Sequence, residues 1–178
     1  LFSQTIFASR ISLCVGLVGV FISFFIGVIL GGISGYFGGI IDNIIQRIIE
    51  LFISIPQIPL WIALSSAVPD HWSGIETFFA ITIILSFVGW TGLARVVRGR
   101  LIALREEDYV MAAKVSNASN YIIIKRHLIP GFFSYLIVHA TLAIPQMILG
   151  ETTLSFLGLG ILPPETSWGA LLQEAQQI

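Results

Sequence analysis

Charged residues are scarce in this chain: they make up 11% of its 178 residues, against about 25% in an average soluble protein. This shortage argues against a water-soluble single domain. The one cysteine, Cys14, excludes an intramolecular disulfide and has no second cysteine with which to bind a metal. Neither of the two lysines, Lys114 and Lys125, follows glycine, so the chain lacks the Gly-Lys-Ser/Thr loop that binds nucleotide phosphates. Any ATP chemistry would therefore belong to another chain.

Motifs of membrane-embedded enzymes are missing as well. Neither His-Glu-x-x-His nor Gly-x-Ser-x-Gly occurs in the sequence. The three histidines, His71, His127 and His139, fall in three different segments, which argues against a catalytic pair. We therefore expect no catalytic residue and no metal site. An enzyme remains only as an alternative, and so does a passive channel, which the apolar segments alone would permit.

Long apolar stretches dominate the chain instead. From Ile11 to Ile41 there is no charged residue, and about 20 apolar residues suffice to cross a bilayer as a helix. We expect an all-α polytopic membrane protein that forms a single transmembrane domain. The expected spans cover residues 11–36, 43–68, 76–97 and 131–150, with 98–130 as a loop and 151–178 as an external segment.

Small residues recur every four positions in and just after the first expected span. They are Gly19, Ser23, Gly27, Gly31, Gly35 and Gly39. This spacing forms a ridge on which a neighbouring helix can pack closely in a membrane. The alternative is a flexible glycine-rich loop, which the intervening Val, Ile, Leu and Phe residues disfavour. The Gly38-Gly39 pair, followed by Asp42, predicts a turn at the end of the span.

Proline interrupts the second expected span. Pro56 and Pro59 predict a kinked or broken helix. Broken backbone at membrane depth must be covered by protein or face a watery cavity. Pro56 and Gln57 are therefore candidates for the lining of a translocation path, with a purely structural kink as the alternative.

Polar residues in and beside the fourth expected span are further candidates for that path. His139 and Gln146 lie at membrane depth, where polar groups often face a pathway. A hydrogen bond between helices is the alternative for both. Glu151 follows the span, and we expect it at the outer surface as a gate or a helix cap.

Basic residues gather in and beside the expected loop. Seven of the nine lysines and arginines lie there: Arg95, Arg98, Arg100, Arg105, Lys114, Lys125 and Arg126. Since Lys and Arg concentrate in cytoplasmic loops, this segment is predicted to be inside and both ends of the chain outside.

Local signals within the loop predict a helix, a turn and a second helix. Acidic residues 106–108 favour a helix N-terminus, and Asn117 can adopt the left-handed conformation that ends a helix. Ser119 is a good N-cap for a second helix, 120–129, which Pro130 should stop.

The segment MAAKVSNASNYIIIKRHLIP resembles the Glu-Ala-Ala loop of permease subunits of ATP-binding-cassette importers. The stretches GWTGLARVVRG, LREEDYVMAA and LGETTLSFLGLGILPPETSWG resemble, more narrowly, the second permease of dipeptide, oligopeptide and nickel importers. The similarity covers essentially the whole chain. Met111 and Asn117 stand where the family has Glu and Gly: the asparagine preserves the turn, whereas Met111 removes a charge that helps to fix the loop. The family's usual first and last spans are absent, which implies a fragment.

The resemblance implies a permease subunit in the bacterial inner membrane that imports di- or oligopeptides, or alternatively nickel or another small solute. Its expected partners are a second permease subunit, two ATPase subunits, a periplasmic substrate-binding protein and the lipid bilayer, without nucleic acid. ATP and Mg would bind to the ATPases, and this chain would hold no cofactor. The residues implied in ATPase coupling are Tyr109, Met111, Ala112, Ala113, Asn117, Ala118, Ser119, Arg126, His127 and Pro130. Contact with lipid headgroups is the alternative for Arg126 and His127.

Overall fold

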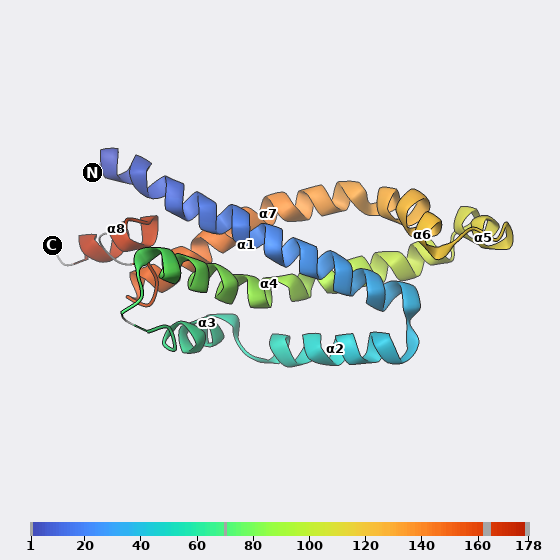
Figure 1. Cartoon of the computed structure of the whole chain (residues 1–178), viewed down its shortest axis with the longest axis horizontal. Coiled ribbons are helices and arrows are strands. Elements are labelled where there is room, and N and C mark those ends of the chain that lie inside the picture. The colour runs from blue at the N-terminus through green and yellow to red at the C-terminus, as the bar shows by residue number, and fades with distance from the viewer. Residues whose placement is uncertain (1, 70, 162–164, 177–178) are drawn as a thin grey trace. The chain divides into compact units, whose positions relative to one another are not determined.

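The computed structural model describes residues 2–69, 71–161 and 165–176, and every regular element among them is a helix. The predicted all-α fold is therefore confirmed for this part of the chain. In chain order (Figure 1), the elements are α1 (Phe2–Phe37), α2 (Gly39–Ser54), α3 (Gln57–Ser65), α4 (Gly74–Arg105), α5 (Asp108–Val115), α6 (Asn120–Ile123), the π-helix η1 (Ile124–Leu128), α7 (Ile129–Phe156) and α8 (Trp168–Ala175).

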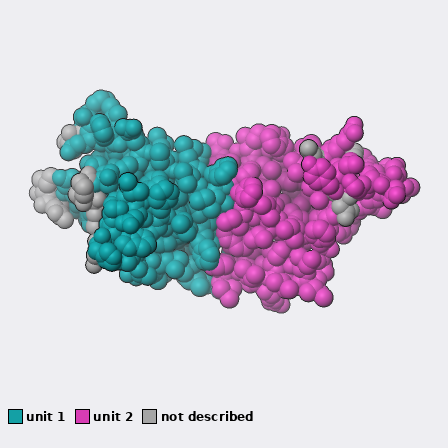
Figure 2. Space-filling view, in the orientation of Figure 1, with its two compact units in different colours: residues 1–23, 53–89, 142–178 teal, residues 24–52, 90–141 magenta. Residues whose placement is uncertain are grey.

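The chain divides into two compact units (Figure 2). Unit 1 comprises residues 1–23, 53–89 and 142–178, and unit 2 comprises residues 24–52 and 90–141. Helices α1, α4 and α7 each have one part in unit 1 and the other part in unit 2, while the loop elements α5, α6 and η1 lie wholly in unit 2.

Three helices of the described chain, α1, α4 and α7, are long and apolar enough to cross a membrane. Helices α2 and α3 pass the same test only as a bent pair, which would make a fourth span. Their break comprises residues 55 and 56, directly before Gln57 begins α3, so the interruption predicted from Pro56 is confirmed. Pro59 lies in the first turn of α3, where a missing N–H breaks no helical hydrogen bond.

Glycines of α1 allow the α1 backbone to approach α4 within unit 2. A Cβ atom on Gly31 would lie 2.4 Å from the carbonyl oxygen of Ala94, and one on Gly35 would lie 2.8 Å from that of Arg98. The predicted packing ridge is thus confirmed there. Gly39 belongs to the turn instead, since it and Gly38 have φ values of 59° and 66°.

The predicted loop 98–130 is shorter than expected, because helices extend into it from both sides. Helix α4 continues to Arg105, through the strong helix formers of the sequence LIALR. Pro130 does not stop the second helix, so that prediction is wrong. The π-helix η1 intervenes: its hydrogen bond from the Ile129 N–H reaches back five residues to the Ile124 carbonyl. This wider turn changes the hydrogen-bond register just before the proline, so the helix continues into α7.

Candidate functional site

Helix α5 is the first part of the predicted coupling loop, and its end is fixed by backbone hydrogen bonds. The N–H of Asn117 donates to the Lys114 carbonyl (2.9 Å), and that of Ala118 donates to the Ala113 carbonyl (3.0 Å). With Asn117 at φ 59°, these two bonds form a Schellman motif. The prediction that Asn117 takes the left-handed conformation is confirmed.

The second helix of the loop begins where the sequence predicts. The Ile123 N–H donates to the Ser119 carbonyl at 3.0 Å, and the Ile122 N–H approaches the Ser119 hydroxyl at 3.5 Å. Ser119 therefore occupies the N-cap position, and the order of helix, turn and helix is confirmed.

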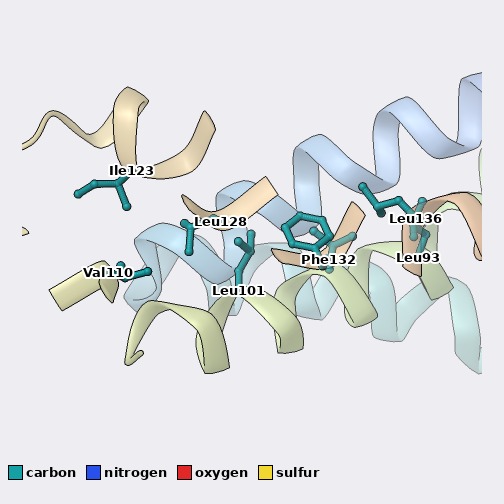
Figure 3. Close-up of a cluster of buried hydrophobic side chains, with 8 residues drawn as sticks. Leu93, Leu101, Val110, Ile123, Leu128, Phe132 and Leu136 are labelled. Atoms are coloured by element: carbon teal, nitrogen blue, oxygen red, sulfur yellow. The ribbon is translucent and has the colours of Figure 1, made fainter. Parts of the chain in front are cut away.

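A buried apolar cluster, here called the loop core, includes a side chain from each short helix and packs them against the longer helices (Figure 3). Its members are Leu93, Val97, Leu101, Val110, Ile123, Leu128, Phe132 and Leu136. Val110 comes from α5 and Ile123 from α6, while the other members come from α4, η1 and α7. Val110, Ile123 and Leu128 lie outside the expected spans, where burying an aliphatic side chain away from water contributes about 1.5–3 kcal/mol to stability. The loop is therefore a packed extension of the long helices.

The residues implied in coupling divide between the two sides of this loop. Ala113 and Ala118 are half-buried and pack against the loop core. The exposed members are Tyr109, Met111, Ala112, Asn117, Ser119, Arg126 and Pro130. The side chain of His127 lies outside what the structure describes. Val115 was missed: it is 86% exposed, and its position four residues after Met111 could have indicated that both share a helix face.

The residues predicted to line a translocation path do not form one described site. Pro56, Gln57 and Gln146 are exposed residues of unit 1. His139 belongs to unit 2, where its ring stacks on that of Tyr135 with 6.1 Å between the centroids. The translocation path therefore stays a prediction.

Glu151 lies in α7, and its side chain is fully buried within the fold. Its expected place at the outer membrane surface, as a gate or a cap, stays a prediction. Its carboxylate accepts hydrogen bonds from the hydroxyls of Ser12 (3.2 Å) and Ser155 (2.6 Å). Both hydroxyl oxygens in turn accept a backbone N–H, from Trp168 at 3.1 Å and from Ile161 at 3.0 Å. A buried acid thereby joins α1, α7 and the segment after α7 within unit 1. Ser155 follows Glu151 by one helical turn, so the contact between these two residues could have been predicted from the sequence.

The fold and the loop together define a membrane protein with several spanning helices, whose α5–α6 helix-turn-helix packs on the loop core. The chain belongs to the family of binding-protein-dependent transport system inner membrane components, whose family model matches residues 27–178. The resemblance found in the sequence motifs is confirmed by this match.

Individual relatives agree with this assignment. The chain is 40% identical over 173 residues to the dipeptide transport system permease protein DppC of Bacillus subtilis. The aligned region covers 97% of this chain and 52% of the relative. It is 41% identical over 171 residues to the oligopeptide transport system permease protein OppC of Haemophilus influenzae, covering 96% and 53%. The chain thus spans about half the length of these curated relatives.

A solved structure shares the fold. It is described as the inward-facing conformation of the MetNI methionine ABC transporter, and the matched chain gives a TM-score of 0.72. The match covers 99% of this chain and 80% of that chain at 20% sequence identity. At this identity the likeness concerns the fold alone.

Proposed function

We propose that this chain is the membrane-spanning part of an importer permease that moves di- or oligopeptides across the bacterial inner membrane. The names of the dipeptide and oligopeptide permease relatives support this substrate class over nickel. The family name supports delivery of the substrate by a separate binding protein. A second permease subunit completes the pathway in this proposal, and two ATPase subunits bind ATP and Mg.

The exposed face of α5 carries the proposal. Met111, Ala112 and Val115 present two apolar side chains and one small residue outside the long apolar helices. Exposed apolar groups that cluster on a rigid support are typical of protein-binding surfaces. The small side chain of Ala112 lets a partner approach the helix closely. An ATPase subunit is the partner that this proposal assigns to the face.

The support beneath α5 explains how such docking would drive transport. Because Val110 packs in the loop core with residues of α4 and α7, a push on α5 is passed to two long helices. Soft, solvated loops absorb such a push, whereas a packed cluster transmits it. The interrupted backbone between α2 and α3 is the part of the pathway lining that this proposal expects to change shape.

Ala112→Asp tests the docking face more cleanly than Ala113→Asp. Ala113 packs against the loop core, so an aspartate there would also place a charge against buried apolar groups. Ala112 is exposed, and its aspartate variant changes only the surface offered to a partner. Ala175→Asp in α8 is the matched control, since it adds the same charge at an exposed alanine of unit 1.

Two readouts decide the result: co-purification of the ATPase subunits with the tagged permease, and uptake of a radiolabelled dipeptide by cells. We expect Ala112→Asp to insert normally but to lose most of both signals, and Ala175→Asp to keep both. Normal ATPase attachment and uptake in Ala112→Asp would refute docking on this face.

A further inference from the structure

A group of polar contacts in unit 2 joins the turn between α1 and α2 to the end of α4. Asp42 lies in the first turn of α2, directly after the glycine turn, where the helix dipole favours an acid. The hydroxyl of Ser34 in α1 donates to Asp42 Oδ1 at 2.5 Å, and Gln46 Nε2 donates to that hydroxyl at 3.1 Å. These contacts fasten the first turn of α2 to the last turns of α1.

Arg98 of α4 binds the same carboxylate with two nitrogens. Its Nε donates to Asp42 Oδ1 and its Nη2 to Asp42 Oδ2, both at 2.5 Å. A bidentate arginine–carboxylate pair fixes orientation as well as distance. The side chains of Arg98 and Asp42 are 32% and 13% exposed, so solvent screens this pair less than a surface pair.

Arg105 repeats the connection two helical turns further along α4. Its Nη1 donates at 3.0 Å to the Tyr36 carbonyl, which belongs to the last turn of α1. Carbonyls in the last turn of a helix lack an intrahelical partner, and a cation there is favourable. Since residues seven apart lie on one side of a helix, Arg98 and Arg105 both face the α1–α2 turn.

Close backbone packing brings the two arginines within reach. Gly35 of α1 has no side chain, and a Cβ there would lie only 3.0 Å from the Arg98 Cα. Arg105 is also the last residue of α4, and α5 begins three positions later at Asp108. The contact of Arg105 with α1 therefore lies three residues before the docking helix in the sequence.

We infer that Asp42, Arg98 and Arg105 form a clamp that makes α1 and α2 follow the displacement of α5. The loop core passes a push on α5 to α4 and α7, and also to α1, whose Phe24, Val28 and Tyr36 pack against it. The clamp adds a polar connection from α4 to α1 and α2. Arg98 and Asp42 are positioning residues in this scheme, which rests on the coupling function proposed above. Without the clamp, the apolar cluster of Ile45 and Ile49 with Trp90 and Ala94 would still hold α2 to α4. The start of the interrupted helix pair would then follow α5 less closely.

Distance measurements on the permease in its native membrane test the clamp without ATP hydrolysis or a transport assay. Spin labels at Ile40 and Val115, which are 78% and 86% exposed in unit 2, report the separation of α2 from α5 in a Cys14→Ala background. We expect one narrow distance distribution in the parent protein and a broad one in Asp42→Asn. Glu50→Gln is the matched control, because it breaks the exposed ion pair of Glu50 with Arg47 on the same helix.

Transport efficiency is the second readout, measured in the intact reconstituted transporter as dipeptide moved per ATP hydrolysed. We expect Asp42→Asn to lower this ratio roughly 5- to 10-fold, the lower part of the usual range for coupling between sites. ATPase attachment should stay normal, because the docking face is untouched. Arg98→Lys keeps the charge but loses the bidentate fork, so it should lower the ratio less.

A charge reversal separates positioning from folding. The double variant Asp42→Arg/Arg98→Asp should recover part of the distance distribution and of the transport ratio that either single reversal loses. The clamp is overturned if Asp42→Asn keeps the parent distance distribution, or if it keeps the parent ratio of dipeptide to ATP. Failure of the ATPases to bind the parent protein would refute the proposed function. The distance measurement would still show whether Asp42 and Arg98 hold α2 in place.

Discussion

Replacing Gly31 with alanine tests how closely α1 and α4 pack in unit 2. The added methyl group would lie 2.4 Å from the carbonyl oxygen of Ala94 and 2.9 Å from the Ala94 Cα. Contacts below 3.0 Å are essentially never made by a Cβ atom, and both neighbours are backbone atoms that cannot rotate away. The two helices must therefore separate by about 0.6 Å to reach that limit.

The cost follows from two opposing effects. Overpacking of a filled interior costs about 1–3 kcal/mol. Alanine recovers up to about 1 kcal/mol over glycine through its helix propensity. We expect a net loss of about 1–2 kcal/mol, which corresponds to a decrease of about 2–8 °C in the melting temperature of a chain of this size.

Thermal unfolding of the purified protein in detergent, followed by the loss of the monodisperse chromatographic peak, measures this decrease. Gly99→Ala in α4 is the control, because nothing lies within 4 Å of its Cβ position. The control should melt at or above the temperature of the parent protein. If Gly31→Ala melts as high as Gly99→Ala, the reasoning about close backbone packing is refuted.

Three further substitutions give distinct outcomes. Asn117→Val should lower the free energy of unfolding by about 1–2 kcal/mol, because a branched residue at positive φ is strained. Asn117→Gly should keep the melting temperature and ATPase attachment. Equal melting temperatures of the two variants would contradict this account of the turn. Glu151→Gln should lower the free energy of unfolding by about 1–3 kcal/mol, since the amide NH₂ of the glutamine would face a serine hydroxyl that donates to the carboxylate in the parent protein. An unchanged melting temperature would show that the acid is dispensable. Arg47→Gln should change the free energy of unfolding by less than about 0.5 kcal/mol, because the ion pair of Arg47 with Glu50 is exposed. A larger loss in the same thermal measurement would contradict this expectation.

Features set by neighbouring residues could be predicted from the sequence. The glycine spacing of α1 places small residues on one helix face whatever packs there, so the ridge was predictable. Asn117 ends α5 because few residues tolerate positive φ, and the signal lies within the turn itself. The break at Pro56 follows likewise from the geometry of proline.

Features that join distant parts of the chain could not be predicted in this way. Ser12 and Glu151 are 139 positions apart, and Arg98 and Asp42 are 56 apart. No local pattern indicates that these groups meet, so neither the burial of Glu151 nor the pairing of Arg98 with Asp42 could be predicted. Pro130 was misjudged for a different reason, because no local pattern indicates the π-helix that accommodates it.

Labelling of a single cysteine at Val115 tests the central claim most directly. In a Cys14→Ala background, Val115→Cys places one thiol on a position of α5 that is 86% exposed. A membrane-impermeant maleimide should label it in inside-out vesicles only, and a short bifunctional reagent should link it to an ATPase subunit. Labelling in right-side-out vesicles, or the absence of any link to a nucleotide hydrolase, would contradict the account of α5 as the cytoplasmic docking helix.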